Sequence, residues 1–89
     1  MIADEYREDL RRQAIAVLAN NQDTPYSVSV LTARLRERLP EVRFDERDVD
    51  QALAFLDGLY LVKRVETALG ASVKWQATSQ GVLFHERNS

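Results

Sequence analysis

The clearest hydrophobic pattern in the chain lies between residues 44 and 62. Apolar residues recur there at steps of three and four, which places them on one face of a helix. These positions are Val49, Ala52, Leu53, Leu56 and Leu59. Asp45 can cap the first turn and Gly58 marks the end, while Leu61-Val62 begins a stretch rich in β-branched residues. The pattern therefore predicts a capped amphipathic helix that runs directly into a strand.

Two further helices are predicted before this one. The first spans Met1 to Asn20, and its apolar stripe consists of Tyr6, Leu10, Ala14, Val17 and Leu18, with Ile15 at the margin. A polar loop over residues 20–25 leads to a very short extended piece at residues 25–27. The second helix runs from about Val28 to Leu39, capped by Ser27 or Ser29 and ended by Pro40. Its stripe consists of Val28, Leu31, Leu35 and Leu39.

The last third of the chain predicts a β-hairpin followed by a short helix. The strands cover about residues 61–66 and 73–78, and Gly70 supplies the permissive backbone that a hairpin tip needs. In the second strand, residues 73, 75 and 77 are apolar and alternate with polar residues, so one face is expected to be buried. Thr78 or Ser79 can cap a final helix that carries Val82, Leu83 and Phe84.

Three helices followed by a two-stranded ribbon are the order of elements in a winged helix-turn-helix domain. The positions that match this arrangement are Tyr26-Ser27, Leu31, Leu35, Val49, Leu53, Leu56, Leu61-Val62 and Thr78-Ser79-Gln80-Gly81. On these residues the segment 26–81 resembles small winged-helix proteins of the bacterial regulator type, most closely short phage and prophage members. The expected fold is α+β, with a three-helix core, a two- or three-stranded β-ribbon and a short C-terminal helix.

The chain departs from this family at one position. Such proteins usually carry glycine two residues before the valine that opens the wing, and here that position is Tyr60. Either the preceding helix ends sooner, or Tyr60 adopts a left-handed backbone conformation that is unfavourable for a side chain.

Composition narrows the class of protein. With 89 residues, 45% of them hydrophobic and 29% charged, the chain is expected to form a single soluble domain over residues 1–89. It has no apolar run long enough to span a bilayer, and its charged N-terminus is unlike a signal peptide. Cysteine is absent, which fits a reducing cytoplasm. These features predict a cytoplasmic protein with no membrane partner.

The fold suggests a double-stranded DNA site. The exposed side of the central helix would present Glu46, Arg47, Asp50, Gln51 and Ala54 to the major groove. We expect Arg47 and Gln51 to read guanine and adenine edges. Lys63, Arg64 and Lys74 of the ribbon and Arg43 of the connector would contact phosphates, and Arg34, Arg36 and Arg38 could add to them. A solvated helix face is the simpler interpretation of the last three.

The distribution of charge argues against this site. The formal net charge of the chain is −2, and residues 45–59 carry five acids and one base, a net charge of −4. The flanking segments 28–44 and 60–78 each carry +2, so basic charge surrounds the central helix without lying on it. The alternative is therefore a protein–protein interaction or dimerisation module. Tyr6, Leu10, Trp75 and residues 82–84 could face a partner in a homodimer built on the first and last helices, or could close the chain's own core.

Nothing in the sequence predicts an enzyme, a metal site or a cofactor. His85 is the one histidine and lies in a polar tail, and there is no thiol nucleophile. Gly70 and Gly81 are isolated and form no phosphate-binding loop.

Overall fold

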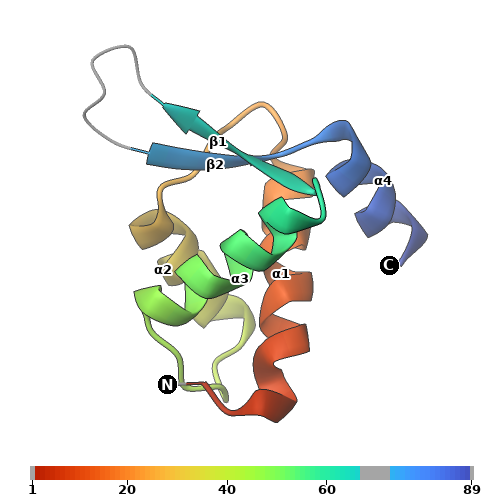
Figure 1. The fold of residues 1–89 in the computed structure, drawn as a ribbon. Helices are drawn as coiled ribbons and strands as arrows, with labels where there is room; N and C mark the ends of the chain where they lie inside the picture. Colours follow the sequence, from red (N-terminus) through yellow and green to blue (C-terminus); the bar gives the residue numbers. More distant parts are fainter. Residues whose placement is uncertain (1, 67–72, 89) are drawn as a thin grey trace.

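The computed structural model describes residues 2–66 and 73–88 of the chain, and Figure 1 shows its elements. A short 3-10 turn, Asp4–Tyr6, precedes helix α1, Arg7–Asn20. Helices α2, Val28–Arg38, and α3, Glu46–Gly58, follow. Strands β1, Val62–Glu66, and β2, Val73–Ala77, lead to helix α4, Ser79–Arg87. The order of elements is the one that the sequence predicts.

Helices α1, α2 and α3 pack against one another and hold the centre of the core. The predicted stripes of α1 and α2 supply fully buried Leu10, Leu18, Leu31 and Leu35, and α3 supplies Val49 and Leu53. Ile15, which the pattern placed at the margin, is also fully buried, because α4 packs against that side of α1 at Gly81.

The first helix begins later than the sequence predicts. Met1 lies outside the described residues, Ala3 has an extended backbone, and regular α-helix starts only at Arg7. Ile2 is buried, and its backbone N–H donates to Oδ1 of Asp48 at 3.3 Å. The start of the chain is therefore attached to the start of α3, and the prediction of helix from residue 1 is wrong.

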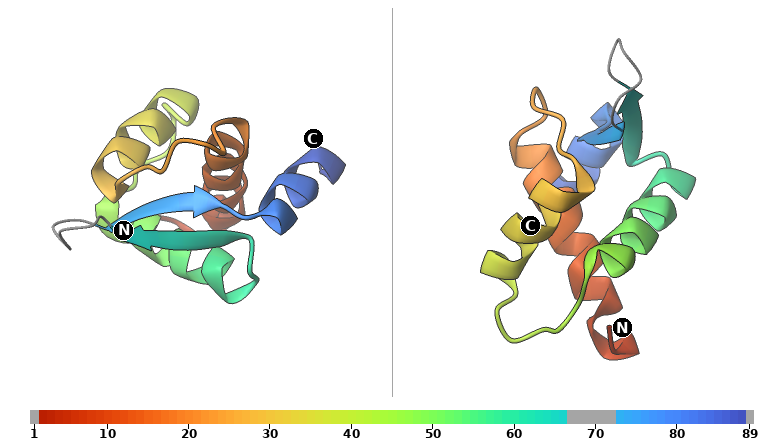
Figure 2. Two further views of the ribbon diagram at one scale, coloured as in Figure 1. Left: turned by 90° about the horizontal axis from the view of Figure 1, so that it is seen from above. Right: turned by 90° about the vertical axis from the view of Figure 1, so that its left-hand side faces the viewer.

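Strands β1 and β2 form a two-stranded antiparallel sheet with Val62 opposite Ala77 and Glu66 opposite Val73. Tyr26 pairs with Trp75 through N–H···O bonds of 2.8 and 2.7 Å and supplies the short extended piece expected there. Gln76 also donates to the backbone carbonyl of Gln22. These bonds fix the ribbon over one end of the helices, as both views in Figure 2 show. The predicted hairpin tip at Gly70 lies outside the described residues.

The end of α3 resolves the two alternatives left open at Tyr60. The helix ends at Gly58, and Tyr60 still has a positive φ of 61°. Its N–H donates to the Asp57 carbonyl at 2.9 Å, and the N–H of Leu61 donates to the Leu56 carbonyl at 3.0 Å. This is a Schellman ending, and Tyr60 occupies the left-handed position where glycine is usual. The backbone turns before Leu59, so that side chain is 52% exposed and its prediction as a core residue is wrong.

Helix α4 packs along α1, on the opposite side of the molecule from the free end of the ribbon (Figure 1). Trp75 and Leu10 are buried in the core and Val82 packs against it, so these residues do not face a partner. Tyr6, Leu83 and Phe84 are exposed. Within residues 2–66 and 73–88, no helix is both long and apolar enough to cross a bilayer.

Candidate nucleic-acid interface

The start of α3 is held by a reciprocal pair of aspartates. Oδ1 of Asp45 accepts from the Asp48 N–H at 3.1 Å, and Oδ2 of Asp48 accepts from the Asp45 N–H at 3.0 Å. The predicted cap is thus confirmed, and Asp48 completes a capping box. Asp48 is buried, so two of the five acids in this segment are bound to the backbone of the chain itself. The exposed acids that remain are Glu46, Asp50 and Asp57.

The capping box makes the fold sensitive to acid. The Asp48 N–H, which donates to the Asp45 carboxylate, lowers the pKa of that carboxyl below its ordinary value. Because the pKa is lower in the folded than in the unfolded chain, the cap stabilises fully above the unfolded pKa and is lost as pH falls toward the folded one.

We therefore expect the melting temperature to fall as the pH drops below about 4, the ordinary range of an aspartate. An Asp45→Asn variant keeps a capping side chain that does not titrate, so its melting temperature should depend less on pH over the same range. Melting curves between pH 6 and pH 3 compare the two proteins. Parallel curves would mean that the Asp45 cap is not the group that titrates.

The exposed face of α3 is the one that the sequence predicts. Val49, Ala52, Leu53 and Leu56 point into the core, and the opposite side presents Glu46, Arg47, Asp50, Gln51 and Ala54 to solvent. Arg47 and Gln51 are one helical turn apart, so both lie along a single line on this face. Side chains on one face of a helix can reach base edges together when that helix lies in the major groove.

The register of the ribbon separates its three basic residues. Lys63 lies opposite Gln76 and Lys74 lies opposite Val65, which puts both lysines on the face away from the core. Arg64 lies opposite Trp75 on the inner face, and its guanidinium is 5.9 Å from the indole centroid. The two lysines are thus free to meet phosphates, whereas Arg64 points toward α3.

A cleft separates the inner face of the ribbon from α3. Its walls are Val28, Asp50, Ala54, Asp57, Arg64, Val73 and Trp75. Two aspartates of α3 therefore face the one arginine of this ribbon face, a grouping that the sequence pattern does not reveal. The strand register would have revealed it, because the register decides whether residue 63 or residue 64 points inward.

The other arginines named as candidates lie on the connector and on α2. Arg43 is exposed in the connector just before α3, close in sequence to Arg47. Arg34, Arg36 and Arg38 are exposed on α2, and Nη1 of Arg38 donates to Oε1 of Gln13 at 3.0 Å. Arg47 and Gln51 therefore share the exposed face of α3, Arg43 precedes that helix beside Arg36 of α2, and Arg38 faces α1. Lys63 and Lys74 lie on the ribbon that follows α3.

Among the described residues, no three or more His, Asp or Glu side chains lie close enough together to hold a metal ion. The absence of catalysis, of a metal and of a cofactor stays a prediction.

Comparison with known proteins identifies the fold. No protein-family model matches the chain, and no curated protein matches it significantly. Two solved structures of ZitR from Lactococcus lactis do match it. One mutant of ZitR aligns over 85% of this chain at 16% identity, and another mutant, in the apo form, over 94% at 18% identity. The TM-score is 0.65 in both cases, and the chain spans 48% and 59% of the two ZitR chains. With α2 and α3 before an antiparallel ribbon, the chain adopts the α+β winged-helix fold.

Proposed function

We propose that residues 1–89 act as one winged-helix domain that binds double-stranded DNA, as a small cytoplasmic transcriptional regulator of bacterial or phage origin. The observation that carries this proposal is the exposed pair Arg47 and Gln51, one turn apart on α3, with Lys63 and Lys74 on the outer face of the adjoining ribbon. The helix supplies two side chains that can discriminate bases, and the ribbon supplies cations that can hold the backbone of the duplex.

The capping box reduces the objection from charge. Asp45 and Asp48 are bound to the backbone of α3, so their carboxylates lie at the helix end and are already satisfied by N–H donors. Glu46 and Asp50 still stand beside Arg47 and Gln51 on the exposed face. An aspartate can accept a hydrogen bond from the amino group of cytosine, so Asp50 is compatible with base reading but weakens non-specific attraction to phosphates.

The proposal predicts different effects for the helix and the ribbon. An Arg47→Ala, Gln51→Ala double variant should lose sequence preference, by about 5- to 150-fold for each base that is no longer read. A Lys63→Ala, Lys74→Ala double variant should weaken binding evenly across sequences and flatten its salt dependence, by about 0.9 in the log–log slope for each phosphate that is no longer neutralised. Fluorescence anisotropy on duplexes selected from a random pool, at several salt concentrations, measures both effects.

Arg7→Ala is a matched control, because it removes a cation at the start of α1, where Arg7 pairs with Asp4 at 2.9 Å. It should leave both affinity and preference unchanged. Circular dichroism of every variant checks that the fold is intact. Binding that is unchanged in both test variants would refute this interface.

The alternative function is a protein–protein interaction module without sequence-specific DNA binding. The exposed acids Glu46, Asp50 and Asp57 on α3 favour it, because they repel phosphates and suit a basic protein surface. A low-salt titration with random duplex separates the two functions. A DNA-binding domain gains affinity steeply as salt falls, whereas a module of the second kind shows no binding at any salt concentration.

A further inference from the structure

A hollow lies between the end of α2 and the connector that leads to α3. Its volume is about 330 Å³, and both apolar residues and arginines line it. The apolar residues are Leu39, Pro40, Val42 and Phe44, and the arginines are Arg36 and Arg43. Phe44 belongs to the core, and Leu39 and Val42 pack against that core, so this connector hollow has a fixed apolar floor.

The two arginines of the connector hollow have no acidic partner within the part of the chain that the structure describes. Both side chains are exposed, and neither forms an ion pair or a side-chain hydrogen bond there. Glu37 and Glu41 are close in sequence, but neither lines the hollow. A guanidinium binds an oxyanion through two parallel N–H···O bonds, so Arg36 and Arg43 favour an anionic partner.

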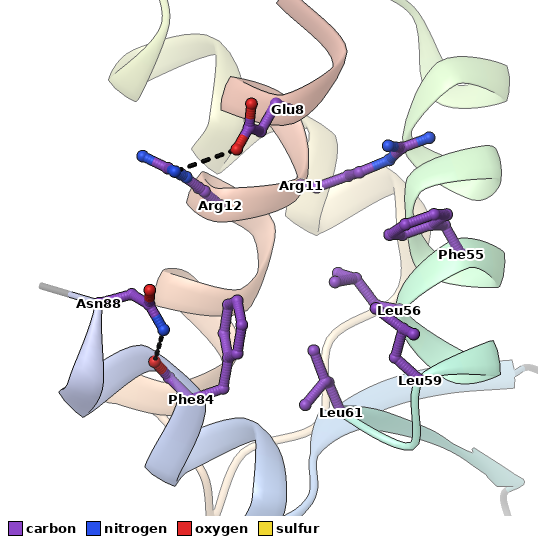
Figure 3. A pocket seen from close by; sticks show the side chains of 9 residues that line it. All are labelled: Glu8, Arg11, Arg12, Phe55, Leu56, Leu59, Leu61, Phe84 and Asn88. Atoms are coloured by element: carbon purple, nitrogen blue, oxygen red, sulfur yellow. Dashed lines mark hydrogen bonds and ion pairs between the residues drawn. The ribbon is translucent and has the colours of Figure 1, made fainter.

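The groove in Figure 3 differs from the connector hollow in this respect. It lies between α1, the end of α3 and α4, and its cations already make contacts within the chain. Arg12 donates to Glu8 at 3.0 Å, and the Arg11 guanidinium lies 3.7 Å from the centroid of the Phe55 ring. The charges around that groove therefore do not select a partner, whereas those around the connector hollow do.

The floor of the connector hollow favours a peptide over a nucleic acid. Proteins commonly hold phosphates with backbone N–H groups as well as with side chains. Here the N–H of Leu39 donates to the Leu35 carbonyl at 2.8 Å, and the N–H of Val42 donates to the Leu39 carbonyl at 3.1 Å. Pro40 has no N–H. These residues offer no donor to a phosphate, but they stabilise an apolar side chain that leaves water beside them.

We propose that the connector hollow binds an acidic segment of a partner protein. An aromatic or aliphatic side chain of that segment lies on the apolar floor, and its carboxylates pair with Arg36 and Arg43. Figures 1 and 2 show the connector at the opposite end of the helices from the ribbon, so such a partner leaves Lys63 and Lys74 uncovered. The proposal gives Arg43 a carboxylate in place of a phosphate, and it can be tested without DNA.

The experiment titrates the protein with the fluorescent peptide Asp-Asp-Phe-Asp-Leu-Leu-Asp-Asp and follows anisotropy at about 0.15 M salt. The wild type should bind it more tightly than a peptide with asparagine for every aspartate, and more tightly than one with serine for every apolar residue. Arg36→Glu and Arg43→Glu should each weaken binding by about tenfold or more, because each removes charge-assisted hydrogen bonds. Nitrogen–proton correlation spectra of the wild type should shift at residues 36–44.

Arg34→Glu is the matched control, because Arg34 is also exposed on α2 but does not line the connector hollow. Its effect should be much smaller, since exposed charges outside the contact are screened at this salt concentration. Circular dichroism of every variant checks the fold.

Three results would overturn the proposal. The wild type could fail to bind the acidic peptide, the asparagine peptide could bind as tightly, or Arg34→Glu could weaken binding as much as Arg43→Glu does. A hollow that serves DNA gives a fourth and different result. Arg36→Glu and Arg43→Glu would then weaken binding to a duplex and leave binding of the acidic peptide unchanged, which would also overturn it.

Discussion

Replacing Leu53 with alanine is expected to lower the free energy of unfolding by about 2–5 kcal/mol. Leu53 is 0% exposed and lies in the core cluster between α3 and α1. Truncation removes buried methyl groups and leaves a cavity that the packed helices can only partly close. Since a domain of this size is stable by only about 5–15 kcal/mol, the variant should be marginally folded at 37 °C. Urea unfolding followed by circular dichroism measures the change.

Leu59→Ala makes the same change at an exposed position just after α3. Leu59 is 52% exposed, so its truncation should lower the free energy of unfolding by less than about 0.5 kcal/mol. Because both variants replace leucine with alanine, the difference between their free energies of unfolding measures the effect of burial. Equal destabilisation of the two variants, or a Leu53→Ala protein as stable as the wild type, would show that the centre of the core lies elsewhere.

The sequence predicts α3 well because several local signals agree there. The cap at Asp45, the apolar stripe and the stop at Gly58 all act within a few residues, and local signals of this kind need no knowledge of the tertiary fold. Thr78-Ser79-Gln80-Gly81 is a second example, since Thr78 caps α4 by accepting from the Gly81 N–H at 3.0 Å. The expected β-ribbon, which follows from alternation, and the short extended piece at Tyr26 are also confirmed, whereas the pairing of Tyr26 with Trp75 is seen only in the structure.

The differences arise where long-range contacts decide the outcome. Residue 2 leaves the helical pattern because its N–H binds Asp48, 46 residues away. Ile15 is buried against α4, which the period of α1 cannot reveal. Leu59 fits the stripe by number, but the helix has already ended, so the period no longer applies to it.

The candidate sites show the same division. The exposed face of α3, with Arg47 and Gln51, follows from the helical period alone. The inward position of Arg64 depends on the pairing of β1 with β2. The groove lined by Leu56, Leu61 and Phe84 depends on the packing of α1, α3, α4 and the segment that leads into β1. The contact of Arg11 with Phe55 joins α1 to α3 and has no signature in either segment. A single sequence therefore predicts which residues a helix exposes, but not which surfaces those residues complete.

Gly81→Ala should destabilise the protein by about 1–3 kcal/mol or more, although alanine favours helices. A Cβ at residue 81 would lie 2.0 Å from the backbone oxygen of Leu61 and 3.0 Å from Cδ1 of Ile15. That oxygen cannot easily move, because it accepts from the Thr78 N–H at 3.0 Å, while Thr78 Oγ1 donates to the Tyr60 carbonyl at 2.6 Å. The clash would push α4 away from the start of the ribbon. Thermal unfolding, with hydrogen exchange of residues 79–87, reports both effects.

Gly58→Ala should change stability in the opposite direction. Gly58 is the last residue of α3, and a Cβ there would meet no atom within 4 Å. Removing glycine flexibility from the unfolded chain should then stabilise by about 0.4–1 kcal/mol. The opposite signs separate steric exclusion from helix propensity, because propensity alone predicts a gain at both positions. A gain in stability from Gly81→Ala would mean that α4 does not pack against Leu61. The position of Phe84 on α4, facing Leu61, would then be wrong as well.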